Sequence, residues 1–280
     1  MRLRNRLAAL AQLVRLPNGL VAAAAVFVGG RWAGTGWSDG RVILAAISAM
    51  GLSALANAHN DFQDRHIDAY VHPERPIPSG AIPAGWVPAI IVVAGVLGVA
   101  TALAARPELG VLSVAVAVTM LAYSGIKERS GLAGNLVVTV IGSLPFLYGA
   151  WAAGNAGAAV PLMALAAPLQ FGREVAKDID DEAGDWEGER PTLPIRLGLT
   201  AAQRIAAAAA LVALLVLAVI AVRLPLVIGV SLLPAVLIVL FGCWQLLRGG
   251  RIPRSNVFRP SNAFKLGMVL AIAAMLPAPR

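Results

Sequence analysis

Two clusters of acidic residues have spacings that suit metal-ion chemistry. Each holds three aspartates at positions 0, +3 and +7, and the second cluster lies 117 residues after the first: Asp61, Asp64 and Asp68, then Asp178, Asp181 and Asp185. On a helix, residues three and four apart share a face. If the helix continues through the first cluster, Asn60, Asp64 and Asp68 form a ridge of oxygen atoms. The spacing therefore predicts two acidic ridges, one in each half of the chain.

Two carboxylate ridges that face each other repel unless a cation lies between them. Hard oxygen ligands suit Mg²⁺, which keeps several waters and is commonly completed by substrate phosphates. Basic side chains near the clusters could bind phosphate oxygens directly, and they are Arg65, Arg75, Lys127, Arg173 and Lys177. The predicted chemistry is therefore the binding of a diphosphate through Mg²⁺.

The composition indicates where this chemistry takes place. The 280 residues are 58% hydrophobic and only 14% charged, and the mean hydropathy is +0.75. Soluble domains are about 45–50% apolar and about 25% charged, so an ordinary soluble domain is excluded. A disordered chain is excluded as well, because so apolar a sequence buries enough surface to fold. An integral membrane protein is predicted, and a lipid with a diphosphate head group is the natural substrate.

The elements that must position the clusters are transmembrane helices of about 20 apolar residues each. The sequence predicts an all-α bundle of nine spans around a central apolar chamber: 17–35, 41–59, 85–105, 109–125, 133–153, 158–176, 200–222, 224–247 and 262–278. Residues 1–16 are basic and amphipathic, which favours an interfacial helix over a cleaved signal peptide. The whole chain, 1–280, is interpreted as one domain. Its two quasi-repeated halves are about 17–125 and 133–247, followed by a last span.

The distribution of charge predicts the orientation in the membrane. With the N-terminus in the cytoplasm, 18 of the 23 Lys and Arg lie on the cytoplasmic side, and the other five are Arg31, Arg41, Arg106, Arg223 and Arg280. This is a strong positive-inside bias. Of the 15 acidic residues, only Asp39 and Glu108 fall outside, so both clusters face the cytoplasm. The net charge of +8 is thereby assigned to topology and catalysis, and no nucleic-acid partner is predicted.

A transporter is the alternative from another functional class. Transporters also use internal repeats and acidic residues, but they place coupling residues near the bilayer midplane in broken helices. Here both clusters lie at the ends of spans, and the span centres carry almost no charge. An enzyme at the membrane surface is therefore favoured over a transporter.

Four motifs resemble the UbiA-type superfamily of intramembrane prenyltransferases. The segment Asn60–Asp68 matches its NDxxDxxxD signature, and Arg75–Gly80 matches the RPIPSG continuation. Tyr123–Lys127 matches the YxxxK element, and Asp181–Asp185 matches the DxxxD element. The order and spacing of the motifs and the nine expected spans all agree with this family. The resemblance covers essentially the whole chain.

The resemblance implies a fold, a cofactor and roles for individual residues. The Mg²⁺–diphosphate would be held by Asn60, Asp64, Asp68, Asp181 and Asp185, with support from Asp61 and Asp178. Phosphate oxygens would be contacted by Arg75, Lys127 and Lys177, and Tyr123 would lie beside the reacting allylic carbon. The metal and the lysines withdraw charge from the leaving diphosphate, so that the carbon–oxygen bond ionises. A second substrate then attacks the allylic cation.

The second substrate is suggested by the stretch before the DxxxD element. The segment Gly172–Asp181, read with Gly184-Asp185, is similar to the branch of the family that makes archaeal-type ether lipids. That branch transfers a geranylgeranyl group from its diphosphate to geranylgeranylglyceryl phosphate. The phosphate of this acceptor would give Arg173 or Lys177 a partner. Branches with aromatic acceptors, such as 4-hydroxybenzoate polyprenyltransferases and chlorophyll synthase, share every general motif and remain the alternative.

Overall fold

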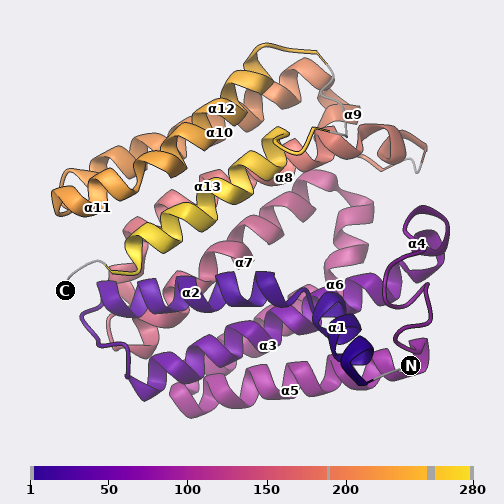
Figure 1. Ribbon diagram of the computed structural model, residues 1–280, viewed down its shortest axis with the longest axis horizontal. Helices are drawn as coiled ribbons and strands as arrows, with labels where there is room; N and C mark the ends of the chain where they lie inside the picture. The colour runs from indigo at the N-terminus through magenta and orange to yellow at the C-terminus, as the bar shows by residue number, and fades with distance from the viewer. Residues whose placement is uncertain (1–2, 188–189, 251–255, 278–280) are drawn as a thin grey trace.

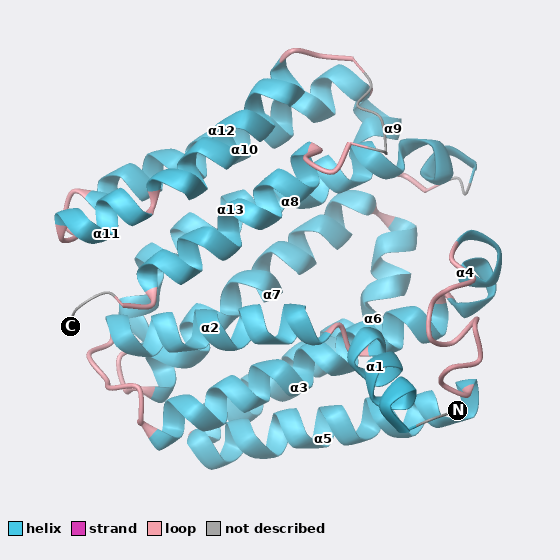
Figure 2. Ribbon diagram, in the orientation of Figure 1, coloured by secondary structure: helices cyan, strands magenta, loops and turns pink. Residues whose placement is uncertain are grey.

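The computed structural model describes residues 3–187, 190–250 and 256–277, and each regular element within these ranges is a helix (Figure 2). The prediction of an all-α protein is confirmed for this part of the chain. Several residues used in the charge argument lie outside the described ranges: Arg2, Glu189, Arg251, Arg254 and Arg280. Residue 278, the end of the last predicted span, lies outside them too.

The helices follow the predicted spans closely. In chain order they are α1 (Leu3–Leu13), α2 (Leu16–Trp32), α3 (Gly40–Gln63), α4 (Arg65–Val71), η1 (Ala84–Trp86), α5 (Val87–Ala105), α6 (Pro107–Arg129), α7 (Gly131–Ala152), η2 (Ala156–Ala159), α8 (Val160–Glu187), α9 (Leu193–Leu197), α10 (Leu199–Ala221), α11 (Leu226–Ser231), α12 (Leu233–Leu247) and α13 (Pro260–Met275). Most predicted spans coincide with one long helix, although 85–105 and 158–176 begin within the short helices η1 and η2, and 224–247 is divided between α11 and α12. The expected interfacial segment forms α1.

Five helical segments in the described residues are long and apolar enough to cross a membrane: α3, η1 with α5, α7, α10, and α11 with α12. The pair α1 and α2, bent by 56°, brings the number to six if it counts as one span. The apolar parts of α6 and α13 are shorter. An integral membrane protein is supported, whereas the count of nine crossings stays a prediction.

Two hydrophobic clusters form the core of the bundle, one on either side of its hollow centre. One cluster joins α2, α7, α8, α10, α12 and α13, and the other joins α2, α3, α5, α6 and α7. The helices α2 and α7 contribute to both clusters, and they cross closely. A Cβ atom at Gly149 of α7 would lie 1.7 Å from the carbonyl oxygen of Val26, so only glycine permits this approach. The α2–α7 crossing therefore joins the two sides of the bundle.

Both acidic clusters lie at the same end of the bundle. The end of α3, the short helix α4, the C-terminal part of α8 and α9 lie toward the right of Figure 1, whereas α11 and the C-terminus lie at the left. The turn between α6 and α7 lies at this end as well. There the Ser130 side chain accepts a hydrogen bond from the Ala133 backbone N–H and caps the start of α7. Two clusters that are far apart in sequence are thereby brought to one end of the fold.

Candidate active site

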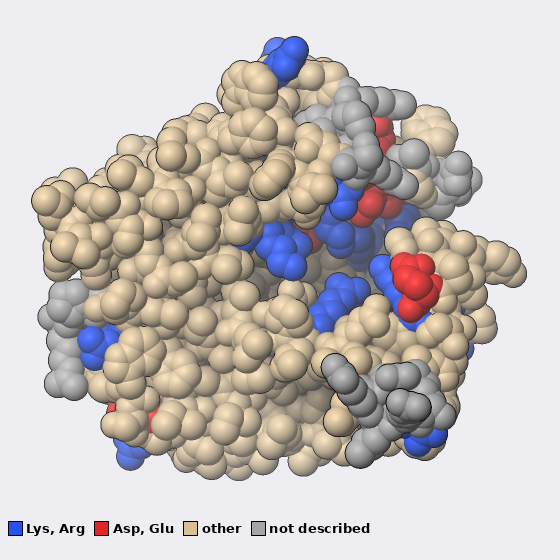
Figure 3. Space-filling model, in the orientation of Figure 1, with Lys and Arg blue, Asp and Glu red and all other residues tan. Residues whose placement is uncertain are grey.

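A cavity of about 540 Å³ lies between α2, α3, α6, α7, α8, α10, α12 and α13. Most of its lining is apolar, including Leu52, Phe146 and Leu165. Its polar lining comes from the helix ends that carry the acidic clusters and from the first residues of α2 and α13. Blue basic side chains surround a hollow on this face of the molecule in Figure 3. The predicted arrangement, an apolar chamber with a polar mouth, is therefore present.

The first motif does not lie on one continuous helix, which corrects the expected geometry. The helix α3 ends at Gln63, Asp64 forms a turn, and α4 begins at Arg65. The i to i−4 bonds nevertheless persist, since the Asp64 N–H donates to the Asn60 carbonyl at 2.9 Å and the Asp68 N–H donates to the Asp64 carbonyl at 2.8 Å. Asn60 and Asp64 line the cavity. Asp64 therefore stays on the cavity side of the break.

The other two aspartates of this motif are buried and paired with arginines. Arg15, at the junction of α1 and α2, donates to Asp61 at 2.9 Å, and Arg75 donates to Asp68 at 2.5 Å. The Arg75 guanidinium also lies 4.0 Å from Asp61. Buried carboxylates are stable as anions only with such partners. The arginine of the RPIPSG segment is thereby fixed beside the first acidic cluster.

The second motif repeats the same alternation of buried and exposed positions. The helix α8 continues without a break to Glu187. Asp178 and Asp185 are buried, whereas Asp181 between them is exposed. In the first motif Asp64 is the exposed member of its triplet. Equal sequence spacing thus gives the same burial pattern twice.

The buried aspartates of α8 have polar partners on neighbouring segments. Asn135 of α7 donates to Asp178 at 2.7 Å, and Arg190 lies 3.8 Å from Asp185. Burial raises the pKa of Asp178 to about 6, and the Asn135 hydrogen bond opposes this rise. Burial also raises the pKa of Asp185. The low-dielectric surroundings therefore favour a cation near both carboxylates.

Three further predicted residues lie between the two motifs. Tyr123 and Lys127, one turn apart on α6, and Lys177 of α8 line the cavity. Tyr123 is within electrostatic range of Asp64 on one side and Asp178 on the other. The positive charges of Lys127 and Lys177 lie close enough to repel each other electrostatically. These two lysines are therefore held close to each other, an arrangement that an anion between them would stabilise.

The described residues contain no group of three or more His, Cys, Asp or Glu side chains that is ready to hold a metal ion. The oxygen donors suit Mg²⁺ in kind, because carboxylates and one amide come from both motifs and a diphosphate supplies further oxygens. The arginines beside Asp61 and Asp68 also show that these carboxylates are paired with positive charge. The individual metal ligands stay a prediction.

Of the basic residues expected beside the acidic clusters, Arg65 does not line the cavity, and sequence reasoning missed other residues that do. Arg65 is absent from the cavity lining, and it donates to the Phe62 carbonyl and stacks over the Phe62 ring. Arg15, Asn18 and Lys265 line the cavity but belong to no predicted motif. Arg15 and Lys265 carried one visible signal, since each places a charge next to an apolar stretch.

The family is decided by a comparison that covers most of the chain. The model of the UbiA prenyltransferase family matches residues 22–266. The chain belongs to the UbiA prenyltransferase family. The four motifs of this UbiA prenyltransferase lie within the matched residues.

Relatives and solved structures agree with this assignment. The digeranylgeranylglyceryl phosphate synthase of Haloquadratum walsbyi is 33% identical over 94% of this chain and 95% of that protein. The enzyme of the same name from Natronomonas pharaonis is 31% identical over 96% of this chain and 100% of that protein. The structure of a UbiA homologue from Archaeoglobus fulgidus bound to GPP and Mg²⁺ is 16% identical and covers 95% of this chain and 98% of that one, with a TM-score of 0.72. This last likeness concerns the fold.

Proposed function

We propose that this UbiA prenyltransferase transfers a geranylgeranyl group from geranylgeranyl diphosphate to geranylgeranylglyceryl phosphate, with Mg²⁺ as cofactor, in the synthesis of ether lipids. The proposal is carried by one observation: an apolar cavity whose mouth holds Asn60 and Asp64 of the first aspartate motif together with basic side chains, among them Lys177, the residue just before the second motif. The named relatives catalyse, by their name, the synthesis of digeranylgeranylglyceryl phosphate. A related structure was solved with GPP and Mg²⁺.

The proposed magnesium ligands are the amide and carboxylate oxygens of the two motifs. They are Asn60, Asp61, Asp64, Asp68, Asp178, Asp181 and Asp185. When bound, Mg²⁺ neutralises the developing negative charge of the departing diphosphate. The exposed members Asp64 and Asp181 are free to approach a metal–diphosphate complex, because neither is enclosed by the surrounding helices.

The other residues bind, orient and shield the substrates in this proposal. Lys127 and Lys177 hold the diphosphate oxygens, and Arg75 contributes while it is fixed by Asp68. Tyr123 lies beside the allylic carbon and stabilises its positive charge through the ring face. The apolar lining holds the isoprenoid chain and keeps water from the allylic cation, so that the acceptor hydroxyl attacks it first.

We further propose that the chain crosses the membrane nine times, with its N-terminus and active site on the cytoplasmic side. The support is the excess of basic residues on that side and the location of both acidic clusters at one end of the bundle.

Conservative substitutions of the two exposed aspartates test the reaction. Asp64→Asn and Asp181→Asn are each expected to lower the rate of prenyl transfer at least about 100-fold, since each removes a charged ligand. Glu108→Gln, the same change at the opposite end of the bundle, is the matched control. Mass analysis of the prenylated product measures activity, and gel filtration in detergent verifies folding. Full activity in both variants would contradict the metal–diphosphate assignment.

The acceptor is tested separately with the purified wild-type enzyme. Geranylgeranyl diphosphate is incubated with geranylgeranylglyceryl phosphate in one reaction and with 4-hydroxybenzoate in another. Product is expected in the first reaction and is lost when EDTA removes Mg²⁺. Product with the aromatic acid alone would show that the alternative acceptor class is correct.

A further inference from the structure

A second group of basic residues lines the cavity away from the aspartate motifs. Lys265 comes from the first turns of α13, Arg173 from α8, and Arg15 from the junction of α1 and α2. Arg173 and Arg15 lie close enough to Lys265 to repel it electrostatically. Three positive charges from separate parts of the chain therefore converge on one side of the cavity.

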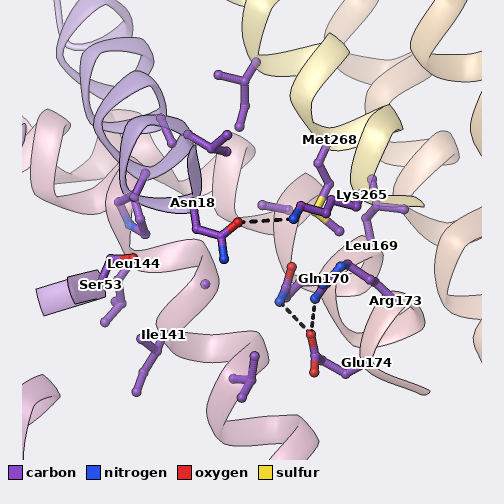
Figure 4. A pocket seen from close by; sticks show the side chains of 18 of the residues that line it. Asn18, Ser53, Ile141, Leu144, Leu169, Gln170, Arg173, Glu174, Lys265 and Met268 are labelled. Atoms are coloured by element: carbon purple, nitrogen blue, oxygen red, sulfur yellow. Dashed lines mark hydrogen bonds and ion pairs between the residues drawn. The ribbon is translucent and has the colours of Figure 1, made fainter. Parts of the chain in front are cut away.

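Internal carboxylates neutralise these three cations only in part. Arg15 pairs with Asp61, and Arg173 pairs with Glu174. Lys265, in contrast, donates to a neutral group, the Asn18 side-chain oxygen, at 3.1 Å (Figure 4). The Arg173 Nε atom is buried and has no hydrogen-bond partner among the described residues. Donor capacity thus remains for an anion, since an unmet buried donor is unfavourable.

The cavity as a whole has more positive charge than one metal-bound diphosphate requires. Its described lining includes seven basic residues, Arg15, Arg75, Lys127, Arg173, Lys177, Arg190 and Lys265, and two acidic residues, Asp64 and Glu174. Lys127 repels Lys177 electrostatically, and Arg15 repels Lys265 in the same way. Arg173 is close enough to repel both lysines. The cations therefore form two groups that meet at Arg173.

We propose that Arg15, Arg173 and Lys265 form a second anion site, oriented by Asn18, that binds the phosphate monoester of the acceptor lipid. This inference rests on the proposed function, in which the acceptor is an isoprenoid glycerol ether with a phosphate. A phosphate monoester carries about two negative charges at neutral pH and three strong acceptor oxygens, which suit three separate donors. Binding there lets the acceptor chain share the apolar cavity with the donor chain.

The substitution Lys265→Gln tests the site, because it removes a cation that donates to the neutral Asn18 side chain rather than to a carboxylate among the described residues. We expect the KM for geranylgeranylglyceryl phosphate to rise about tenfold or more, the value of one charge-assisted hydrogen bond, with the KM for geranylgeranyl diphosphate unchanged. Lys265→Arg keeps the charge and is expected to restore most of the affinity. Arg204→Gln, which removes an exposed charge from α10, is the matched control.

The same variants are compared on an acceptor without its phosphate, geranylgeranylglycerol. Wild type and Lys265→Gln are expected to use it at equal rates, since the missing phosphate leaves the lysine without a ligand. A loss of equal size with both acceptors, a raised KM for the diphosphate donor, or no change at all would each overturn the proposal.

Direct binding separates this proposal from the proposed function. Titration calorimetry in nanodiscs, without Mg²⁺ or donor, is expected to show binding of geranylgeranylglyceryl phosphate by wild type and by Lys127→Gln, and weakened binding by Lys265→Gln. Binding without subsequent transfer would refute the proposed reaction but support the anion site. Absence of binding to wild type would refute the anion site, even if transfer from the diphosphate to another acceptor occurs.

Discussion

At the scale of single residues, burial decides which aspartates of the two motifs are open to a ligand. The middle members, Asp64 and Asp181, are exposed, whereas their flanking aspartates are buried and paired with Arg15, Arg75, Asn135 or Arg190. The sequence predicted the motifs because their spacing is local. It did not predict these partners, because each comes from a segment distant in sequence. Arg15, which is 46 residues from Asp61, is the clearest example.

If Asp178 is a magnesium ligand, as proposed, it sets the pH dependence of metal binding at this scale. Its pKa is raised to about 6 by burial, so the carboxylate becomes protonated and loses affinity for Mg²⁺ as the pH falls through that value. The hydrogen bond from Asn135 favours the charged form, so Asn135→Ala is expected to raise the pKa further. The Mg²⁺ concentration for half-maximal activity, measured from pH 5 to 8, should then begin to increase at a higher pH than in wild type. An unchanged profile would show that Asp178 does not control it.

At the scale of helices, hydropathy predicted the elements well because each span is a long apolar window. It could not predict where helices break. The interruption at Asp64 separates α3 from α4, and that at Leu232 separates α11 from α12. Neither residue is a helix breaker, although Pro234 follows the second interruption closely. The breaks depend on tertiary packing, which a single-sequence pattern does not contain.

The crossing of α2 and α7 gives a prediction at this scale. Gly149→Ala places a Cβ atom 1.7 Å from the Val26 carbonyl oxygen, so the two helices must separate. Overpacking of this kind costs about 1–3 kcal/mol or more. Thermal unfolding in detergent should show a clearly lower Tm. Gly229→Ala is the matched control, since nothing lies within 4 Å of its added Cβ atom, and a similar Tm for both variants would contradict the role of this crossing.

At the scale of the whole molecule, two packed clusters enclose a cavity that takes its charged residues from both halves of the chain. The expected chamber and its location beside the acidic clusters followed from composition and charge. The participation of α13 in the mouth through Lys265 did not follow, because a single lysine at the start of a span resembles an ordinary topology signal. The contacts that give it another role exist only in three dimensions.

Orientation in the membrane is tested on the intact protein in cells. The one cysteine, Cys243, is buried, and Cys243→Ala leaves a background without thiols. Ser38→Cys and Thr200→Cys then place single exposed thiols at opposite ends of the bundle. A membrane-impermeant maleimide is expected to label the first variant in intact cells and the second only after lysis. The reverse pattern would invert the proposed topology.

The repeated burial pattern of the two aspartate triplets has a consequence for how such a fold can change over evolutionary time. Between the triplets the chain passes through the four long helices α5, α6, α7 and α8. In the proposed topology each of these four helices crosses the membrane, and an even number of crossings returns the chain to the membrane face from which it started. Duplication or loss of two helices therefore keeps both triplets on one face, whereas gain or loss of a single helix separates them across the bilayer. Parity thus restricts the rearrangements that the fold can survive, however small their effect on stability.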